Sequence, residues 1–324
     1  MEHANMVYNG PKADFATLTG SPLWGLSYQE VAADYVRRGW IHLADHRPDT
    51  PYGIGPIVQH FLTQEAKSVI RIPSYGMELG KDWDDGNSMN KMFWILWKAG
   101  VRVLLIGGTS GIADWREGSD KILPGDIVLP WSFRTSPRHR GLPGTEFESA
   151  WPRFDLTLED PFCTDLAQML ESAAKLQVQK GLLRRLHTTR DASVALIVPD
   201  GITFETNYDI MMWNTLNRMI SIMHPGPAVV SLHGDCINPV LARLLGIHVV
   251  YYHMVANVAQ GLPMEESIIE SLYRLYLGNF ATAALEMEFT LLQEMPIPTG
   301  DQCSCVSSLH VAPTVFTTAM GGAL

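Results

Sequence analysis

The stretch VRVLLIGGTSGIADWREGSDKILPGDIVLP, residues 101–130, decides the fold class of this chain. Residues 101–106 are apolar apart from one arginine and follow Gly100, which predicts a strand buried on both faces. The glycine-rich residues 107–111 predict a flexible loop, and residues 123–130 predict a turn and another short strand. Buried strands of this kind, alternating with amphipathic helices, are typical of an α/β protein.

The same alternation continues on both sides of this stretch. Residues 88–99 carry apolar side chains at helical spacing and end before Gly100. Further segments are predicted from their apolar runs and turn residues. We expect strands at 68–72, 193–198, 228–232 and 247–255, and helices at 165–179, 208–222, 240–245 and, interrupted near Gly278, 265–295. We expect residues 1–324 to form a single domain, with a core at about 15–295 and an irregular tail at 296–324.

Composition narrows the class of protein. The chain has 324 residues, 46% of them apolar, and a net charge of −10, which argues against a nucleic-acid-binding protein. No apolar run is long enough to span a membrane, and residues 1–12 lack the apolar centre of a signal peptide. The four cysteines form no zinc quartet, and Cys303 and Cys305 are expected to lie in a plain tail without a metal or redox role. We therefore expect a cytoplasmic protein without a metal or a cofactor.

Six segments, in this order, resemble the purine nucleoside phosphorylase and methylthioadenosine phosphorylase family. They are DTPYG at 49–53, residues 107–130, Arg134-Thr135, GITFET at 201–206, AVVSLHGDCINPVLARLLGI at 228–247 and MVANVA at 254–259. The resemblance implies a nucleoside-phosphorylase-like α/β fold, with a mixed twisted sheet or distorted barrel flanked by helices. It also implies a homo-oligomer, commonly a trimer, that acts on a small nucleoside-like substrate as a pentosyltransferase.

For the base, the resemblance points to Phe204, Glu205 and Asn257. A carboxylate at Glu205 can accept a hydrogen bond from N1–H of a 6-oxopurine, and the amide of Asn257 can donate to N7 or O6. Hydrogen bonding at N7 makes the base a better leaving group. Phe204 would stack on the base. In the alternative interpretation, Glu205 is a solvated turn residue and Asn257 caps the end of a strand.

The phosphate-binding segments depart from the family pattern. Where the family has a glycine-rich loop, residues 19–24 read TGSPLW; Ser21 keeps a hydroxyl, whereas Pro22 removes a backbone N–H. The family's Arg-His-Gly is replaced by Ser74, Tyr75 and Gly76, so a charge is lost. Thr109 and Ser110 remain as expected donors. Arg71 is expected on the opposite face of its strand from Ser74, which leaves Arg134 or Arg138 to compensate.

The ribose end also differs from the family. His233 and Asp235 stand where the family has an apolar contact, and Met264 suggests an apolar 5′ pocket. His233 with Asp235 can act as a general base. Alternatively, His233 bonds locally in a turn and Asp235 caps the next helix. His253 is expected in the core.

Three functions are compatible with these observations. The first is a phosphorylase that transfers ribose from a purine to phosphate. The second is an enzyme of the same fold that acts without phosphate, as a nucleoside hydrolase or as a lyase, isomerase or cyclase on a small metabolite. A nucleoside-binding sensor without turnover is a third, non-enzymatic reading.

Overall fold

The structure is a computed structural model of the 324-residue chain. It describes residues 6–73, 88–113, 121–130, 132–134, 145, 154–156, 161–188, 193–197, 207–208, 210–212, 215, 219, 228–232, 239–259, 276–298, 303 and 309–311. Its elements follow in the order β1 Phe15–Thr19, η2 Ser21–Leu23, α1 Tyr28–Arg37, β2 Ile41–His46, β3 Asp49–Thr50, β4 Gly53–Ile54, β5 Val58–Leu62, β6 Ser68–Arg71, α2 Ser88–Ala99, β7 Val103–Ala113, β8 Ile127–Val128, β9 Ser132–Arg134, β10 Phe154–Leu156, α3 Thr164–Gln179, β11 Leu186–His187, β12 Ser193–Ile197, β13 Ala228–Leu232, α5 Pro239–Leu244, β14 His248–Val258, η3 Tyr276–Phe280, α7 Ala281–Glu294 and β15 Leu309–Val311.

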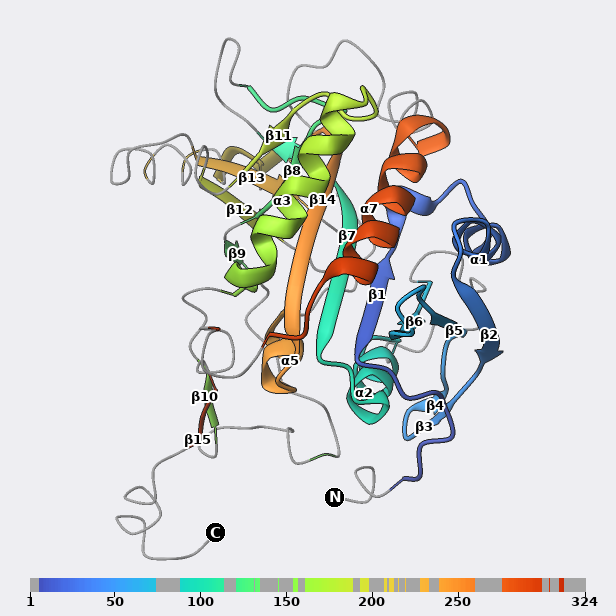
Figure 1. The fold of residues 1–324 in the computed structure, drawn as a ribbon. Helices are drawn as coiled ribbons and strands as arrows, with labels where there is room; N and C mark the ends of the chain where they lie inside the picture. Colours follow the sequence, from blue (N-terminus) through green and yellow to red (C-terminus); the bar gives the residue numbers. More distant parts are fainter. Residues whose placement is uncertain are drawn as a thin grey trace, which may run out of the picture.

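A mixed sheet of eleven strands forms the centre of the molecule, in the order β11-β8-β14-β7-β1-β6-β5-β2, with β13, β12 and β9 branching from β7. Strand β1 and the long strands β7 and β14 run parallel and lie side by side (Figure 1). Their parallel direction brings their carboxyl ends to one edge of the sheet, where ligands bind in many α/β proteins. The expected α/β fold with a mixed sheet flanked by helices is confirmed.

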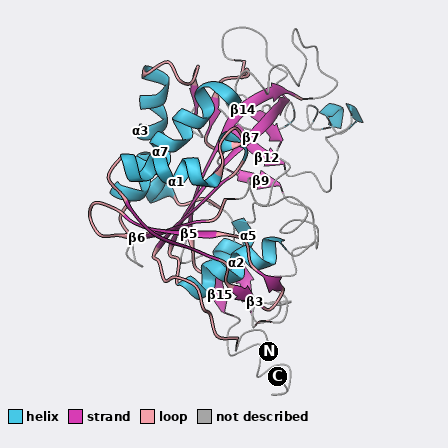
Figure 2. Cartoon of the chain, turned by 90° about the vertical axis from the view of Figure 1, so that its right-hand side faces the viewer, coloured by secondary structure: helices cyan, strands magenta, loops and turns pink. Residues whose placement is uncertain are grey.

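Helices cover both faces of the sheet (Figure 2). Apolar side chains of α1, α3 and α7 pack on one face with Phe15, Leu105 and Val250. Those of α2 and α5 pack on the other face with Ala16, Leu104 and Val249. Because neighbouring strand residues point to opposite faces, each central strand contributes alternate side chains to the two cores. Among the described residues, no helix has the length and apolar character that crossing a membrane requires.

The predicted flexible loop at residues 107–111 is wrong, because these residues continue strand β7 to Ala113. Their backbone pairs with β14 on one side and with β1 and then β13 on the other. Glycine is required at the start of this segment. A Cβ on Gly107 would lie 2.3 Å from the Tyr252 hydroxyl oxygen and 2.9 Å from Thr19 Oγ1. The glycines therefore leave room for side chains that pack against a central strand, and they do not interrupt the strand.

The carboxyl-terminal segment also differs from its prediction. The tail was expected to be irregular, but β15 pairs with β10 in an antiparallel ladder, and Cys303 is 3% exposed in the core. The helix predicted at 265–295 is described from Tyr276, and its expected interruption is confirmed, since Gly278 has non-helical angles. Most of the helix predicted at 208–222 lies outside the described residues.

Candidate active site

The candidate site begins with a contact between the turn that follows β1 and a residue within β7. The Ser21 hydroxyl accepts hydrogen bonds from Thr109 N at 3.0 Å and from Thr109 Oγ1 at 2.8 Å. Gly20 N donates to Gly107 O at 3.0 Å, which holds the turn after β1 against the neighbouring strand. Ser21 is 6% exposed and Thr109 7%. With two hydrogen bonds accepted, Ser21 keeps its own hydroxyl hydrogen for a ligand.

Pro22 fits the local backbone of this turn. Residues Ser21–Leu23 form a single 3₁₀ turn in which Leu23 N donates to Gly20 O at 3.0 Å and Trp24 N to Ser21 O at 3.1 Å. Proline suits the first turn of a helix because its missing N–H would have no partner there. The turn therefore offers a ligand the hydroxyl of Ser21 but no backbone N–H from Pro22.

Ser110 follows Thr109 in β7, so its side chain points to the opposite face of the sheet, whereas Asn257 lies on the neighbouring strand β14. The Ser110 hydroxyl is buried and has no hydrogen-bond partner among the described residues. A register shift in β14 between Val255 and Asn257 pairs Asn257 with Gly111. A Cβ on Gly111 would be 2.9 Å from Asn257 Nδ2, so glycine makes room for the amide. Such bulges redirect side chains and are common beside functional sites.

The amide of Asn257 has a local partner as well. Its Nδ2 donates to Val258 O at 2.9 Å, which is close to the strand-end cap considered in the sequence. That bond uses one of the two amide hydrogens, so the other hydrogen and the carboxamide oxygen can still bind a ligand. Asn257 is 6% exposed.

A buried polar cluster lies on the α7 side of the same strands, and the sequence interpretation missed it. Tyr35 donates a hydrogen bond to Glu288 Oε2, and Arg71 Nη1 donates to Gln59 Oε1 at 2.9 Å. Arg71 is 1% exposed and Glu288 is fully buried. Burial raises the pKa of Glu288, and the Arg71 charge and the hydroxyls of Thr19, Tyr35 and Thr17 offset this only in part. The sequence feature that could have indicated this cluster is the pair of polar residues Thr17 and Thr19 at alternate positions of the buried strand β1.

The remaining predicted site residues fall mostly outside the described residues. These are Tyr75, Phe204, Glu205, His233, Asp235 and Met264, together with Ser74 and Arg138. Arg134 is the last residue of β9, where its Cα is paired with Ile197. Thus the structure brings Ser21 and Thr109 into direct contact and sets Ser110 and Asn257 on adjacent paired strands. His253 is fully buried, as expected, with its ring edge-on to Tyr251 at 4.4 Å.

Comparison with solved structures identifies this architecture. A methylthioadenosine phosphorylase from an antarctic soil metagenomic library superposes with a TM-score of 0.63, covering 93% of this chain and 92% of that chain at 15% identity. The chain has the fold of a methylthioadenosine phosphorylase. The enzyme from Schistosoma mansoni in complex with adenine gives a TM-score of 0.61 over 87% of this chain and 91% of that chain, at 14% identity.

The same Schistosoma mansoni methylthioadenosine phosphorylase in complex with tubercidin gives a TM-score of 0.59, also at 14% identity, over 87% of this chain and 91% of that one. No protein-family model and no curated protein matches the sequence. The methylthioadenosine phosphorylase likeness is therefore one of fold.

Proposed function

We propose that this protein is a purine-nucleoside-cleaving pentosyltransferase that transfers ribose from the base to phosphate. The observation that carries the proposal is the pair of buried hydroxyls formed by Ser21, just after β1, and Thr109, within β7, beside Asn257 on β14. The methylthioadenosine phosphorylase fold and the six motifs support the same reaction class.

Phosphate would bind to the hydroxyls of Ser21 and Thr109, which are in direct contact, whereas the Ser110 hydroxyl lies on the other face of β7. Ser21 is buried and has its hydrogen free to donate. A buried hydroxyl left unsatisfied costs about 1–3 kcal/mol, so an oxyanion that accepts from it would recover this loss. Hydrogen bonds to an anion are stronger than neutral ones. Arg134 or Arg138, from the same or a neighbouring subunit, would supply the charge lost at Ser74 and Tyr75.

The purine would bind beyond the phosphate, near Asn257. The amide would donate to N7 or O6, Glu205 would accept from N1–H, and Phe204 would stack on the ring. This donor and acceptor pattern favours hypoxanthine or guanine. Catalysis would then come from stabilising the ribosyl cation between the departing base and the incoming phosphate.

The sugar would lie between these two groups. His233 and Asp235 would flank the ribose, Tyr75 would line the phosphate end, and Met264 would face the 5′ substituent. A homotrimer in the cytoplasm would complete the resemblance to the family; sedimentation of the purified chain measures its assembly state.

Incubating the protein with inosine, guanosine and methylthioadenosine, with and without phosphate, tests the proposal. Phosphate-dependent release of hypoxanthine or guanine, with ribose 1-phosphate as the second product, is expected. Base release that does not need phosphate would favour the hydrolase alternative. No base release from any of the three nucleosides would reject nucleoside cleavage.

A further inference from the structure

Two cysteines and a histidine that are distant in sequence meet inside the protein. The sulfur of Cys163 lies 3.8 Å from His248 Nδ1 and 3.5 Å from the sulfur of Cys303. The three ligand atoms all lie within 4.8 Å of one another. Cys163 is fully buried, and His248 and Cys303 are each 3% exposed.

The fold positions each of these side chains through its backbone. Cys163 is the N-cap residue of α3 but makes no side-chain capping bond, and its N–H donates to Val249 O at 2.8 Å. That bond places Cys163 beside His248, the first residue of β14, whose own N–H donates to Arg102 O at 2.8 Å. Cys303 reaches the same point from the carboxyl-terminal segment.

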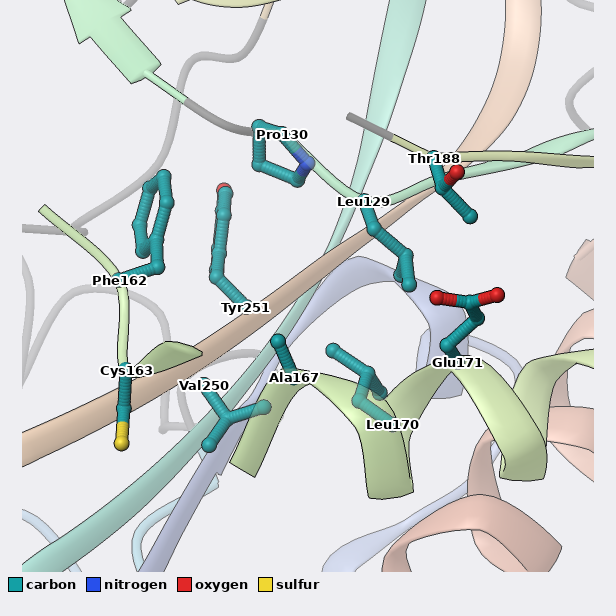
Figure 3. Close-up of a pocket in the computed structure, with 10 residues that line it drawn as sticks. All are labelled: Leu129, Pro130, Phe162, Cys163, Ala167, Leu170, Glu171, Thr188, Val250 and Tyr251. Atoms are coloured by element: carbon teal, nitrogen blue, oxygen red, sulfur yellow. The ribbon is translucent and has the colours of Figure 1, made fainter. Parts of the chain in front are cut away.

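Cys163 is one of the residues that line a small hollow beside α3, but its thiol is turned away from the other lining side chains (Figure 3). That hollow is lined by Leu129, Phe162, Glu171 and Tyr251, among others, and the sulfur points away from these side chains (Figure 3). The rings of Phe162 and Tyr251 stack at 5.6 Å. The sulfur is therefore directed to Cys303 and His248, and not into the space beside α3.

The distances match a metal site better than a disulfide. A disulfide needs its sulfurs about 2.05 Å apart, much less than the 3.5 Å between Cys163 and Cys303. Two thiolates on a tetrahedral zinc ion, at about 2.3 Å each, lie roughly 3.8 Å apart, and a thiolate and an imidazole nitrogen lie roughly 3.6 Å apart. We propose that Cys163, His248 and Cys303 bind a structural zinc ion, with water as the fourth ligand.

The charges of such a site balance. When zinc binds, the two thiols release their protons to solvent, and the two thiolates neutralise the ion. Arg243, which donates through Nε to Pro161 O at 3.0 Å, places a positive charge near Cys303. A neutral zinc–thiolate group does not repel this guanidinium.

The location indicates a structural role. His248 begins β14, whereas Asn257 lies nine residues further along the same strand, about 30 Å away for an extended chain. The ion would thus lie at the opposite edge of the sheet from the candidate active site. It would join α3, β14 and the carboxyl-terminal segment. Along the chain, Cys163 is 85 positions from His248 and 140 positions from Cys303.

The experiment uses the full chain, reduced and stripped with a chelator. Zinc is titrated in competition with a chromophoric chelator, and cobalt(II) is added to a second sample for absorption spectra. We expect one zinc ion per chain, thiolate-to-cobalt charge-transfer bands, and zinc-dependent protection of the carboxyl-terminal segment from proteolysis. Cys163→Ser and Cys303→Ser should lower zinc affinity by roughly a hundredfold or more, while Cys236→Ser retains it.

Three results would overturn the proposal. They are a reduced wild-type chain that takes up no zinc, a cobalt spectrum without thiolate bands, and unchanged zinc affinity in Cys303→Ser. Cys303 lies outside every helix and strand, so this variant decides the question if Cys163→Ser does not fold. Circular dichroism of the stripped proteins verifies that each variant is folded.

Discussion

At the scale of single residues, Ser21 combines burial with an unused hydroxyl hydrogen. It accepts hydrogen bonds from Thr109 N and Thr109 Oγ1 and so keeps its own hydrogen for a ligand. Because a hydrogen bond to a charged group contributes about 1.5–3 kcal/mol, Ser21→Ala should raise the KM for phosphate by about 10- to 100-fold. Steady-state kinetics at varied phosphate concentration measures this change.

The control for that variant is Ser172→Ala. Ser172 is an exposed serine on α3 whose hydroxyl donates to Gln168 O at 2.9 Å. This change should leave the phosphate KM unaltered. Equal KM values for Ser21→Ala and wild type would remove Ser21 from the phosphate site.

The amide of Asn257 provides a residue-scale test of base preference. Replacing it with aspartate keeps the size of the side chain and exchanges a donor for an acceptor at neutral pH. Asn257→Asp should lower kcat/KM for inosine and raise it for adenosine, because an aspartate can accept from the 6-amino group. A ratio of the two kcat/KM values that stays constant would contradict the assignment of Asn257 to the base.

The buried carboxyl group of Glu288 should make the free energy of unfolding depend on pH. Its folded-state pKa is raised, chiefly by burial, so the folded protein holds a proton that the unfolded chain releases above its ordinary pKa of about 4.3. The free energy of unfolding therefore falls as pH rises from that value toward the folded-state pKa. Glu288→Gln removes this loss and still accepts the hydrogen bond from Tyr35.

Urea unfolding at several pH values measures this effect. The stability of Glu288→Gln relative to wild type should increase by about 1.4 kcal/mol per pH unit within that window. Glu294→Gln, at an exposed position on the same helix, is the matched control and should show no such trend. A constant difference between Glu288→Gln and wild type would contradict a raised pKa.

At the scale of elements, strand β7 depends on its glycines. Gly107 faces the hydroxyls of Tyr252 and Thr19 at distances that leave no room for a Cβ. Gly107→Ala should destabilise the protein by about 1–3 kcal/mol through overpacking. In a Tyr252→Leu background the hydroxyl and the ring carbon Cζ, which would lie 2.4 Å from the added Cβ, are both removed, so the same change should cost less. Unfolding free energies of the four proteins in this double-mutant cycle give the coupling.

A comparison of the predicted and observed strands shows which of them could be predicted from the sequence. Apolar runs bounded by Gly predicted β7, β13 and β14 in the right places, because burial of a central strand is a local property of its sequence. The same reasoning gave the wrong prediction for residues 107–111. Their glycines have the composition of a loop, and only pairing with β14 and β13 makes them a strand.

At the scale of the whole molecule, the carboxyl-terminal segment is part of the fold. It contributes β15 to a ladder with β10 and buries Cys303 in the core. Removing residues 299–324 should lower the free energy of unfolding by about 1–3 kcal/mol even with a chelator present, since it exposes apolar core surface. Thermal unfolding compares the truncated and full chains.

The candidate site should tolerate that truncation. Ser21, Thr109 and Asn257 belong to elements that end before the removed segment. We expect kcat/KM at low temperature to stay within about threefold of the full chain, which corresponds to less than 1 kcal/mol. A complete loss of turnover in a folded truncated chain would place the segment at the site itself.

The sequence by itself determined the alternation of strands and helices, the α/β class and the hydroxyls after β1 and in β7. These are local properties, because a run of apolar residues or a turn proline acts within a few positions. The tertiary structure alone decided that Cys163, His248 and Cys303 meet, and that Glu288 is buried near Arg71 and Tyr35. Such groups lie tens to hundreds of positions apart along the chain, and only the packing of helices on the sheet brings them together.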